Sequence, residues 1–185
     1  MTSKTLGVIG LGSMGLGAAL SAHRKGVPTW GCDPRAEARE AFVKEGGRVA
    51  ATPAELAAQC DVVLILVVNA AQTEDVLFGA GAVAQHLKPG SVVVASATVD
   101  PSLPPQWDTR LRERGLWLID GPVSGGAAKA AQGQMTVMAS GPPEAFEAAG
   151  GVLEALAGKV YRLGDAAGIG STVKMVNQHL AGVHI

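Results

Sequence analysis

The sequence has few aromatic residues, only two cysteines and no long hydrophobic run, and each shortage narrows the class of protein. Aromatic residues make up 4% of the 185 residues, so aliphatic side chains and glycine must supply the core. Cys32 and Cys60 form no CxxC pair, and no spacing of Cys, His and Asp suggests a metal site. The longest apolar run, Val62–Val68, is too short to cross a bilayer. Without a recognisable signal peptide, these features predict a reduced, cytoplasmic protein with no membrane partner.

The chain also lacks an excess of either charge, because 15 Lys and Arg residues nearly balance 16 Asp and Glu residues. The net charge of −1 disfavours a nucleic-acid partner, which would need a basic surface. Any site for an anion must therefore be local, built from helix N-termini and single basic side chains.

Short apolar runs alternate with longer amphipathic stretches along most of the chain. The expected strands are residues 5–9, 29–32, 49–50, 62–67, 91–95, 116–119, 135–139 and 160–163. The expected helices include one continuous helix over residues 143–156 and a last helix from residue 168 to the end. This alternation predicts an α/β fold with a doubly wound, mostly parallel Rossmann sheet.

The segment Gly10-Leu11-Gly12-Ser13-Met14-Gly15 follows the first expected strand and opens a helix. Gly10 permits a tight turn, Gly12 lets the backbone approach a pyrophosphate, and Gly15 lets the helix pack closely on the sheet. The N–H groups at the start of the helix would face the phosphates, and the helix dipole would add attraction. The segment therefore predicts a dinucleotide site.

Asp33 and Pro34 follow the second expected strand. Asp33 lies roughly 18 residues beyond Gly15, near the spacing of about 20 at which a carboxylate binds the ribose hydroxyls. Its charge would repel a 2′-phosphate, which favours NAD over NADP as the cofactor. Arg35 weakens this preference, because a nearby guanidinium could bind that phosphate. The alternative is that Asp33 only forms a turn before Pro34.

Two further strands end in polar residues, at the edge where open α/β sheets bind their ligands. Val68 and Asn69 follow one strand, and Ser96-Ala97-Thr98 follows the next. Asn69 and Thr98 could hydrogen-bond the nicotinamide ribose or ring, and either could equally be an ordinary helix cap.

The segment from Asp120 to Gly126, with the sequence Asp-Gly-Pro-Val-Ser-Gly-Gly, closes another strand. Such a loop can present successive N–H groups and the Ser124 hydroxyl to an anion. Gly125 and Gly126 allow the backbone to approach with no side chain in the way. The segment is a candidate site for a small carboxylate, or simply a tight turn into the next helix.

Lys174 lies in an apolar stretch of the final helix, flanked by Val173 and Met175. Partial burial would lower its pKa, so that a neutral amine could take a hydroxyl proton. Asn177 and Gln178 share its helical face and could orient it or bind a substrate hydroxyl. The alternative is that Lys174 extends to solvent.

The final helix keeps an apolar stripe to its last residue, with neither a capping glycine nor a proline stop. We therefore expect residues 1–168 to be a dinucleotide-binding domain. Residues 169–185 are expected to start an interdomain helix that leads to a helical domain outside this chain. The alternative is a terminal helix docked on the sheet.

Four of these segments occur in the same order in the β-hydroxyacid dehydrogenases, and the chain resembles that family over essentially its whole length. They are the GLGxMG loop, Ser96–Thr98, the DxPVSGG loop and the GxxxK segment that ends at Lys174. The residues after Lys174 look most like the L-threonate dehydrogenase branch. The chain differs from the family pattern at Gln178, where many members have Asn, and at Ala97, where Ser is common.

The resemblance implies a hydride transfer between NAD and a small 3-hydroxy acid, of the L-threonate or 3-hydroxyisobutyrate type. It implies that Ser124, Gly125 and Gly126 hold the substrate carboxylate. It also implies an all-helical second domain, through which family members pair as homo-oligomers and which completes the substrate pocket.

The resemblance further implies that Lys174 is the acid/base and that Asn177 or its neighbour Gln178 assists it. Thr98 then lies by the nicotinamide, next to the substrate. The alternative function is a non-catalytic NAD-binding module that needs a helical partner. A third interpretation, an imine reductase, is disfavoured by Lys174 beside the Ser-Gly-Gly segment.

Overall fold

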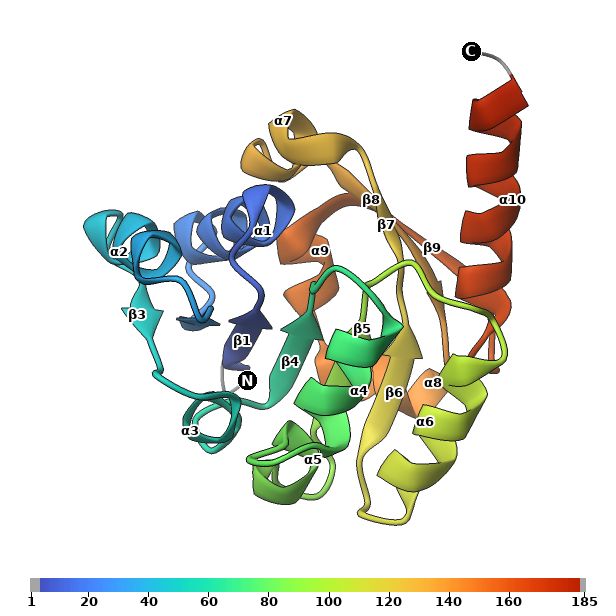
Figure 1. The fold of residues 1–185 in the computed structure, drawn as a ribbon, viewed down its shortest axis with the longest axis horizontal. Helices are drawn as coiled ribbons and strands as arrows, with labels where there is room; N and C mark the ends of the chain where they lie inside the picture. The colour runs from blue at the N-terminus through green and yellow to red at the C-terminus, as the bar shows by residue number, and fades with distance from the viewer. Residues whose placement is uncertain (1–3, 184–185) are drawn as a thin grey trace.

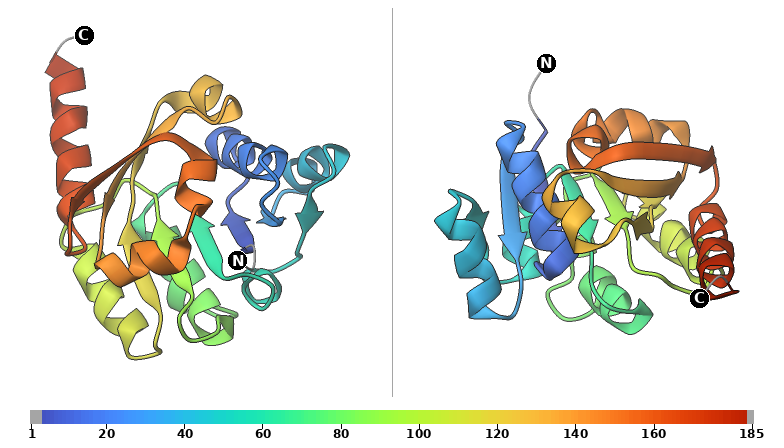
Figure 2. Two further views of the ribbon diagram at one scale, coloured as in Figure 1. Left: turned by 180° about the vertical axis from the view of Figure 1, so that it is seen from behind. Right: turned by 90° about the horizontal axis from the view of Figure 1, so that it is seen from above.

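The computed structural model describes residues 4–183, which form a twisted sheet with helices on both faces (Figures 1 and 2). The strands are β1 (Leu6–Ile9), β2 (Thr29–Cys32), β3 (Arg48–Val49), β4 (Val62–Ile65), β5 (Val92–Ala95), β6 (Trp117–Asp120), β7 (Val123–Ser124), β8 (Met135–Ser140) and β9 (Ala157–Gly164). Their order is β3-β2-β1-β4-β5-β6-β8-β7, and β9 pairs with β8. Strands β1 to β6 are parallel, which confirms the predicted doubly wound Rossmann sheet.

The helices divide between the two faces of the sheet, and each face has its own apolar core. One face carries α1 (Ser13–Arg24), α2 (Ala36–Lys44), α7 (Gly126–Ala131), α8 (Pro143–Ala149) and α9 (Val152–Leu156). The other carries α3 (Pro53–Ala57), α4 (Ala70–Phe78), α5 (Val83–His86) and α6 (Leu103–Arg112). Burial on both sides explains why the central strands β1, β4 and β5 are wholly apolar.

Helix α10 (Ile169–Val183) lies at the side of the sheet, where its first turns contact β6, β8 and β9. Its C-terminal half extends away from the sheet (Figure 1). Val176 and Val183 of that half are 55% and 78% exposed. Within residues 4–183, no helix is both long enough and apolar enough to cross a membrane.

The structure differs from the sequence-based expectation in the region after β6. The continuous helix predicted over residues 143–156 is wrong, because Gly150 adopts a φ of +57° and ends α8 before α9 begins. Strand β7 was not predicted, since two residues are too few to show a periodicity. Its residues pair with β8 in the same antiparallel register as Asp120, so β6 and β7 form one extended segment.

Both cysteines are buried and free, as small packing residues are expected to be. Burial raises the pKa of the Cys32 thiol to about 11, with a further contribution from the charge of Asp33. Burial also raises the pKa of Cys60, to about 12. Both thiols therefore stay protonated and unreactive at neutral pH.

Candidate active site

The glycine segment after β1 lies where the strand order reverses, between β1 and β4. Gly10 has a φ of +93°, and a Cβ there would overlap the carbonyl oxygen of Leu66. A Cβ on Gly15 would overlap the carbonyl oxygen of Gly10. Gly10 is therefore required by its positive φ and by the approach of the backbone after β4, and Gly15 by the close packing of α1 on the turn after β1, as predicted.

Gly12 differs from its neighbours, because a Cβ at this position would meet no atom within 4 Å. Gly12 is the N-cap of α1, and no side chain caps the helix. The first N–H groups of α1, at Ser13, Met14 and Gly15, thus start a helix whose N-terminus has space in front of it. This arrangement fits an anionic group such as a pyrophosphate.

A cavity of about 670 Å³ opens beside this helix terminus, at the carboxyl ends of β1, β2 and β4. Its lining includes Gly10, Gly12, Asp33, Pro34, Arg35 and Val68. The size is within the usual range for a small-molecule site. The structure therefore brings together the glycine segment, the acid after β2 and the residue after β4, as a dinucleotide site requires.

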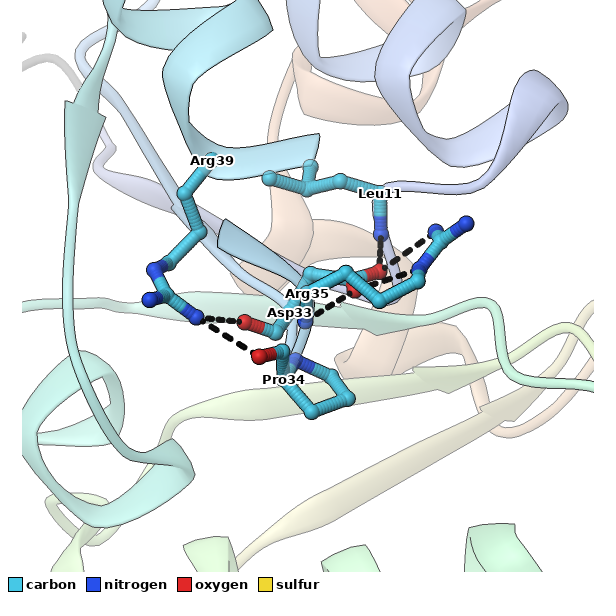
Figure 3. A network of polar contacts seen from close by, with 5 residues as sticks. All are labelled: Leu11, Asp33, Pro34, Arg35 and Arg39. Carbon is cyan, nitrogen blue, oxygen red and sulfur yellow. Dashed lines mark hydrogen bonds and ion pairs between the residues drawn. The ribbon is translucent and has the colours of Figure 1, made fainter. Parts of the chain in front are cut away.

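The Asp33 carboxylate is only 4% exposed and accepts hydrogen bonds on both oxygens (Figure 3). The Leu11 amide donates to Oδ2 at 2.8 Å, and the Arg35 amide donates to Oδ1 at 2.9 Å. The Arg35 guanidinium spans both oxygens, at 2.9 and 3.1 Å. Burial alone would raise the pKa of Asp33, but these donors hold that pKa below its usual value. Asp33 is therefore a carboxylate at neutral pH, and Arg35 partly neutralises it.

Arg39 supports the same turn, although nothing in the sequence pointed to it. Its Nη1 donates to the carbonyl oxygens of Asp33 and Pro34, at 2.6 and 3.0 Å (Figure 3). Because it contacts only backbone atoms, Arg39 fixes the path of the chain without occupying the carboxylate.

Asn69 and Gln72 cap the start of α4. The Asn69 side chain accepts from the Gln72 amide at 2.9 Å, and the Gln72 side chain accepts from the Val68 amide at 2.9 Å. The helix-cap interpretation of Asn69 is thus confirmed, and any contact with a cofactor would be additional. Val68 is 81% exposed at the cavity, and Thr98 is exposed after β5.

The Asp120 carboxylate is 1% exposed and binds the first turn of α10. Oδ2 accepts from the amides of Gly168 and Ser171, at 2.9 and 2.8 Å, and Oδ1 accepts from the Ser171 hydroxyl at 2.7 Å. Burial raises the pKa of this carboxyl, while the hydrogen bonds from Ser171 and Gly168 oppose the shift. The sequence pattern included Asp120 and Ser171 in two motifs but gave no sign that they touch.

A second cavity, of about 450 Å³, lies between the end of the β6–β7 segment and α10. Ser124 and Asn177 both line it, together with Thr136, Met138, Tyr161 and Leu163. Gly125 and Gly126, with φ of +128° and +71°, begin the exposed helix α7. The loop is therefore a tight turn into α7, and its Ser124 lines the same cavity as Asn177.

Lys174 is buried as a residue, with 8% of its surface exposed, so most of its side chain is packed within the protein. Together with Gly170 and Ser171, it forms the buried face of α10. Burial lowers the pKa of its amine below the usual value. Asn177 lies one turn further along the helix at the second cavity, and both Asn177 and Gln178 are exposed.

The sheet order, the glycine segment at the N-terminus of α1 and the carboxylate after β2 define a Rossmann-type dinucleotide-binding domain. Residues 5–164 match the family described as the NAD binding domain of 6-phosphogluconate dehydrogenase. The chain belongs to this family.

Three relatives illustrate the similarity. The chain is 57% identical to L-threonate dehydrogenase of Cupriavidus necator over 99% of its own length and 62% of the relative's. It is 33% identical to mitochondrial 3-hydroxyisobutyrate dehydrogenase of Mus musculus, over 99% and 55% of the two lengths. The crystal structure of 3-hydroxyisobutyrate dehydrogenase from Salmonella typhimurium superposes with a TM-score of 0.93 at 48% identity, over 98% and 63%. The chain thus spans about three fifths of the length of these relatives.

Proposed function

We propose that the chain serves an NAD-dependent oxidation of a short 3-hydroxy acid, of the L-threonate or 3-hydroxyisobutyrate type. The observation that carries the proposal is the cavity that Ser124 and Asn177 both line, since Asn177 lies one turn along α10 from the buried residue Lys174. The similarity to L-threonate dehydrogenases at 50–57% identity supports the choice of substrate class.

Different residues of the chain would bind the cofactor, bind the substrate and transfer the proton. Gly10 to Gly15 and Asp33 would hold NAD, which when bound supplies the electron acceptor for the alcohol carbon. Ser124 and the following glycine amides would bind the substrate carboxylate. Lys174, whose pKa burial lowers, would take the hydroxyl proton, and Asn177 would hydrogen-bond the same hydroxyl. Homo-oligomer formation and a helical second domain remain predictions.

The direct test measures reduction of NAD by absorbance, with L-threonate and 3-hydroxyisobutyrate as substrates. Calorimetric titration of NAD accompanies the assay. We expect NAD binding and substrate-dependent reduction. NAD binding without reduction of NAD by either acid would contradict the proposed reaction.

A second candidate function is an NAD-binding module that becomes active only with a helical partner. It is favoured by the exposed apolar side chains along α10, which include Val173, Met175, Val176, Leu180 and Val183. Such a stripe normally packs against another element. The module predicts the second outcome of the same test, NAD binding without turnover.

Cofactor preference should depend on the balance between Asp33 and Arg35. Replacing Asp33 with Asn removes the charge that repels a 2′-phosphate and leaves the Arg35 guanidinium free to bind it. We expect D33N to shift the NAD-to-NADP affinity ratio toward NADP by about 10- to 100-fold. We expect R35A to shift it toward NAD.

Arg39→Ala is the matched control, because it removes the same charge as R35A but a side chain that contacts only backbone carbonyls. Titrations of each variant with both cofactors give the ratio. An unchanged ratio in D33N would show that Asp33 does not lie at the adenosine ribose.

The pH dependence of the reaction should follow the amine of Lys174. Since this amine must be neutral to accept a proton, oxidation of the hydroxy acid should be slow at low pH. It should rise through the lowered pKa of Lys174, which lies below the ordinary lysine value. The reverse reduction needs the ammonium and should fall over the same interval. A rate of oxidation that is flat with pH would argue against Lys174 as the base.

A further inference from the structure

Asp120 and Ser124 belong to one continuous extended segment. The antiparallel register against β8 pairs Asp120 with Ser140, Val123 with Val137 and Ser124 with Thr136, with no residue gained or lost. Because side chains alternate along an extended chain, Asp120 and Ser124, four residues apart, lie on the same face.

That face is covered by the start of α10. A Cβ added to Gly170 would overlap the backbone carbonyl oxygen of Met138 and would come within 2.6 Å of the carbonyl oxygen of Asp120. The helix therefore touches the backbone of β6 and β8. The Asp120 carboxylate accepts from Gly168 and Ser171, while the Ser140 hydroxyl accepts from the Gly170 amide at 2.9 Å. No acidic residue lies in the first turn of α10 itself. Its N-terminal amides are therefore bound by a carboxylate from a distant strand.

The segment from Asp120 to Ser124 is also hydrogen-bonded to the end of β5. The Ser96 hydroxyl donates to the carbonyl oxygen of Gly121 at 2.7 Å, and the Gly121 amide donates to that of Ala95 at 2.9 Å. Asp120 thus lies at the junction of the Ser96–Thr98 segment, the loop that carries Ser124 and the helix that carries Lys174.

We infer that Asp120 is a positioning residue, which fixes Lys174 and Asn177 relative to Ser124 by binding the first turn of α10. Lys174 follows Ser171 by three residues, so it lies on the face of α10 that the carboxylate holds against the sheet. The inference rests on the proposed function, because it assigns Asp120 to the geometry of that reaction. Asp120 itself does not touch the substrate.

The test replaces Asp120 with Asn, which keeps the shape of the side chain but removes its charge. The control is Asp61→Asn. The Asp61 carboxylate also accepts a hydrogen bond from a backbone amide, that of Thr5 at 2.9 Å, but Asp61 is far in sequence from α10. We expect D120N to lower kcat by about 10- to 100-fold, because a small displacement of a catalytic group has effects of this size. The KM for NAD should change less than about twofold, and D61N should match the wild type.

Amide hydrogen exchange supplies a readout that does not need turnover. We expect the peptide that covers residues 168–175 to exchange about tenfold faster or more in D120N, with little change elsewhere. If the wild type shows no turnover, the proposed function fails and the exchange result alone decides the role of Asp120. When turnover is present, a fall in kcat without faster exchange, or faster exchange without a fall in kcat, would overturn the inference.

Ser171→Ala provides a milder variant in case D120N does not fold. It removes only the hydroxyl that donates to Oδ1 and leaves both amide donors in place. We expect a decrease in kcat of about 3- to 10-fold with an unchanged KM for NAD. Wild-type kinetics in S171A, together with wild-type exchange, would count against the role of Asp120.

Discussion

Lys174→Met is expected to reduce turnover by about 10²- to 10⁴-fold, the usual contribution of a general acid or base. Met keeps the length and the apolar part of the side chain, so the cavity beside Asn177 should keep its shape. The affinity for NAD should be unchanged, because the nucleotide cavity is lined by other residues. Steady-state kinetics and NAD titration of the same preparation measure the two effects.

The same substitution should stabilise the fold. Burial lowers the pKa of Lys174 in the folded state. Below that pKa the folded protein carries a buried ammonium, which lowers its free energy of unfolding. For the wild type, stability should therefore rise with pH between the lowered pKa and the ordinary lysine value. Lys174→Met removes this penalty at neutral pH, and its melting temperature should increase by roughly 2–4 °C for each kcal/mol gained.

Lys44→Met is the matched control, because Lys44 is an exposed lysine of α2. It should leave both turnover and melting temperature close to the wild type. Normal turnover in the Lys174 variant would exclude proton transfer by this amine. A lower melting temperature would instead show that the ammonium has a stabilising partner in the folded protein.

Gly12→Ala is expected to abolish dinucleotide binding while leaving the fold intact. Gly12 has a φ of −67°, and a Cβ would meet nothing within 4 Å, so alanine fits the protein alone. The added methyl would occupy the space in front of the α1 N-terminus, where the pyrophosphate is expected. We expect the affinity for NAD to fall by about 100-fold or more, with the loss of stability limited to about 1 kcal/mol.

Gly151→Ala is a close control, since Gly151 is also an N-cap glycine with a negative φ and open space around its Cβ. It should bind NAD normally. Gly15→Ala should behave differently from both, because its Cβ overlaps the Gly10 carbonyl, and binding and fold should be lost together. Wild-type affinity in Gly12→Ala would mean that no phosphate approaches this position.

The sheet and the nucleotide cavity were predictable because their signals are local. A buried parallel strand is an apolar run, and the glycines of the Gly10–Gly15 segment follow the first run at fixed spacing. The acid at position 33 also follows its strand directly. What spacing could not show is the conformation of Arg35. The sequence suggested Arg35 only as a ligand for a phosphate, whereas its guanidinium forms an ion pair with Asp33 in the structure.

The residues of the candidate substrate site were predictable from the sequence, but the contacts that bring them together were not. The motifs containing Ser124 and Lys174 were visible in the sequence, but their relation depends on hydrogen bonds from Asp120 to residues about 50 positions away. No periodicity encodes such contacts. The burial of Lys174 was likewise undecided, since an apolar helix flank allows both a buried and an extended lysine. Only the packing of α10 on β8 distinguishes them.

The uninterrupted pairing of β6 and β7 with β8 has a consequence for how this region can vary among related chains. Substitutions within it change individual contacts, but a single inserted or deleted residue between Asp120 and Ser124 would turn the serine hydroxyl to the opposite side of the sheet. The number of residues in this stretch is therefore more tightly constrained than their identity. Length changes should be tolerated only outside it, in the turns that join helices on the protein surface.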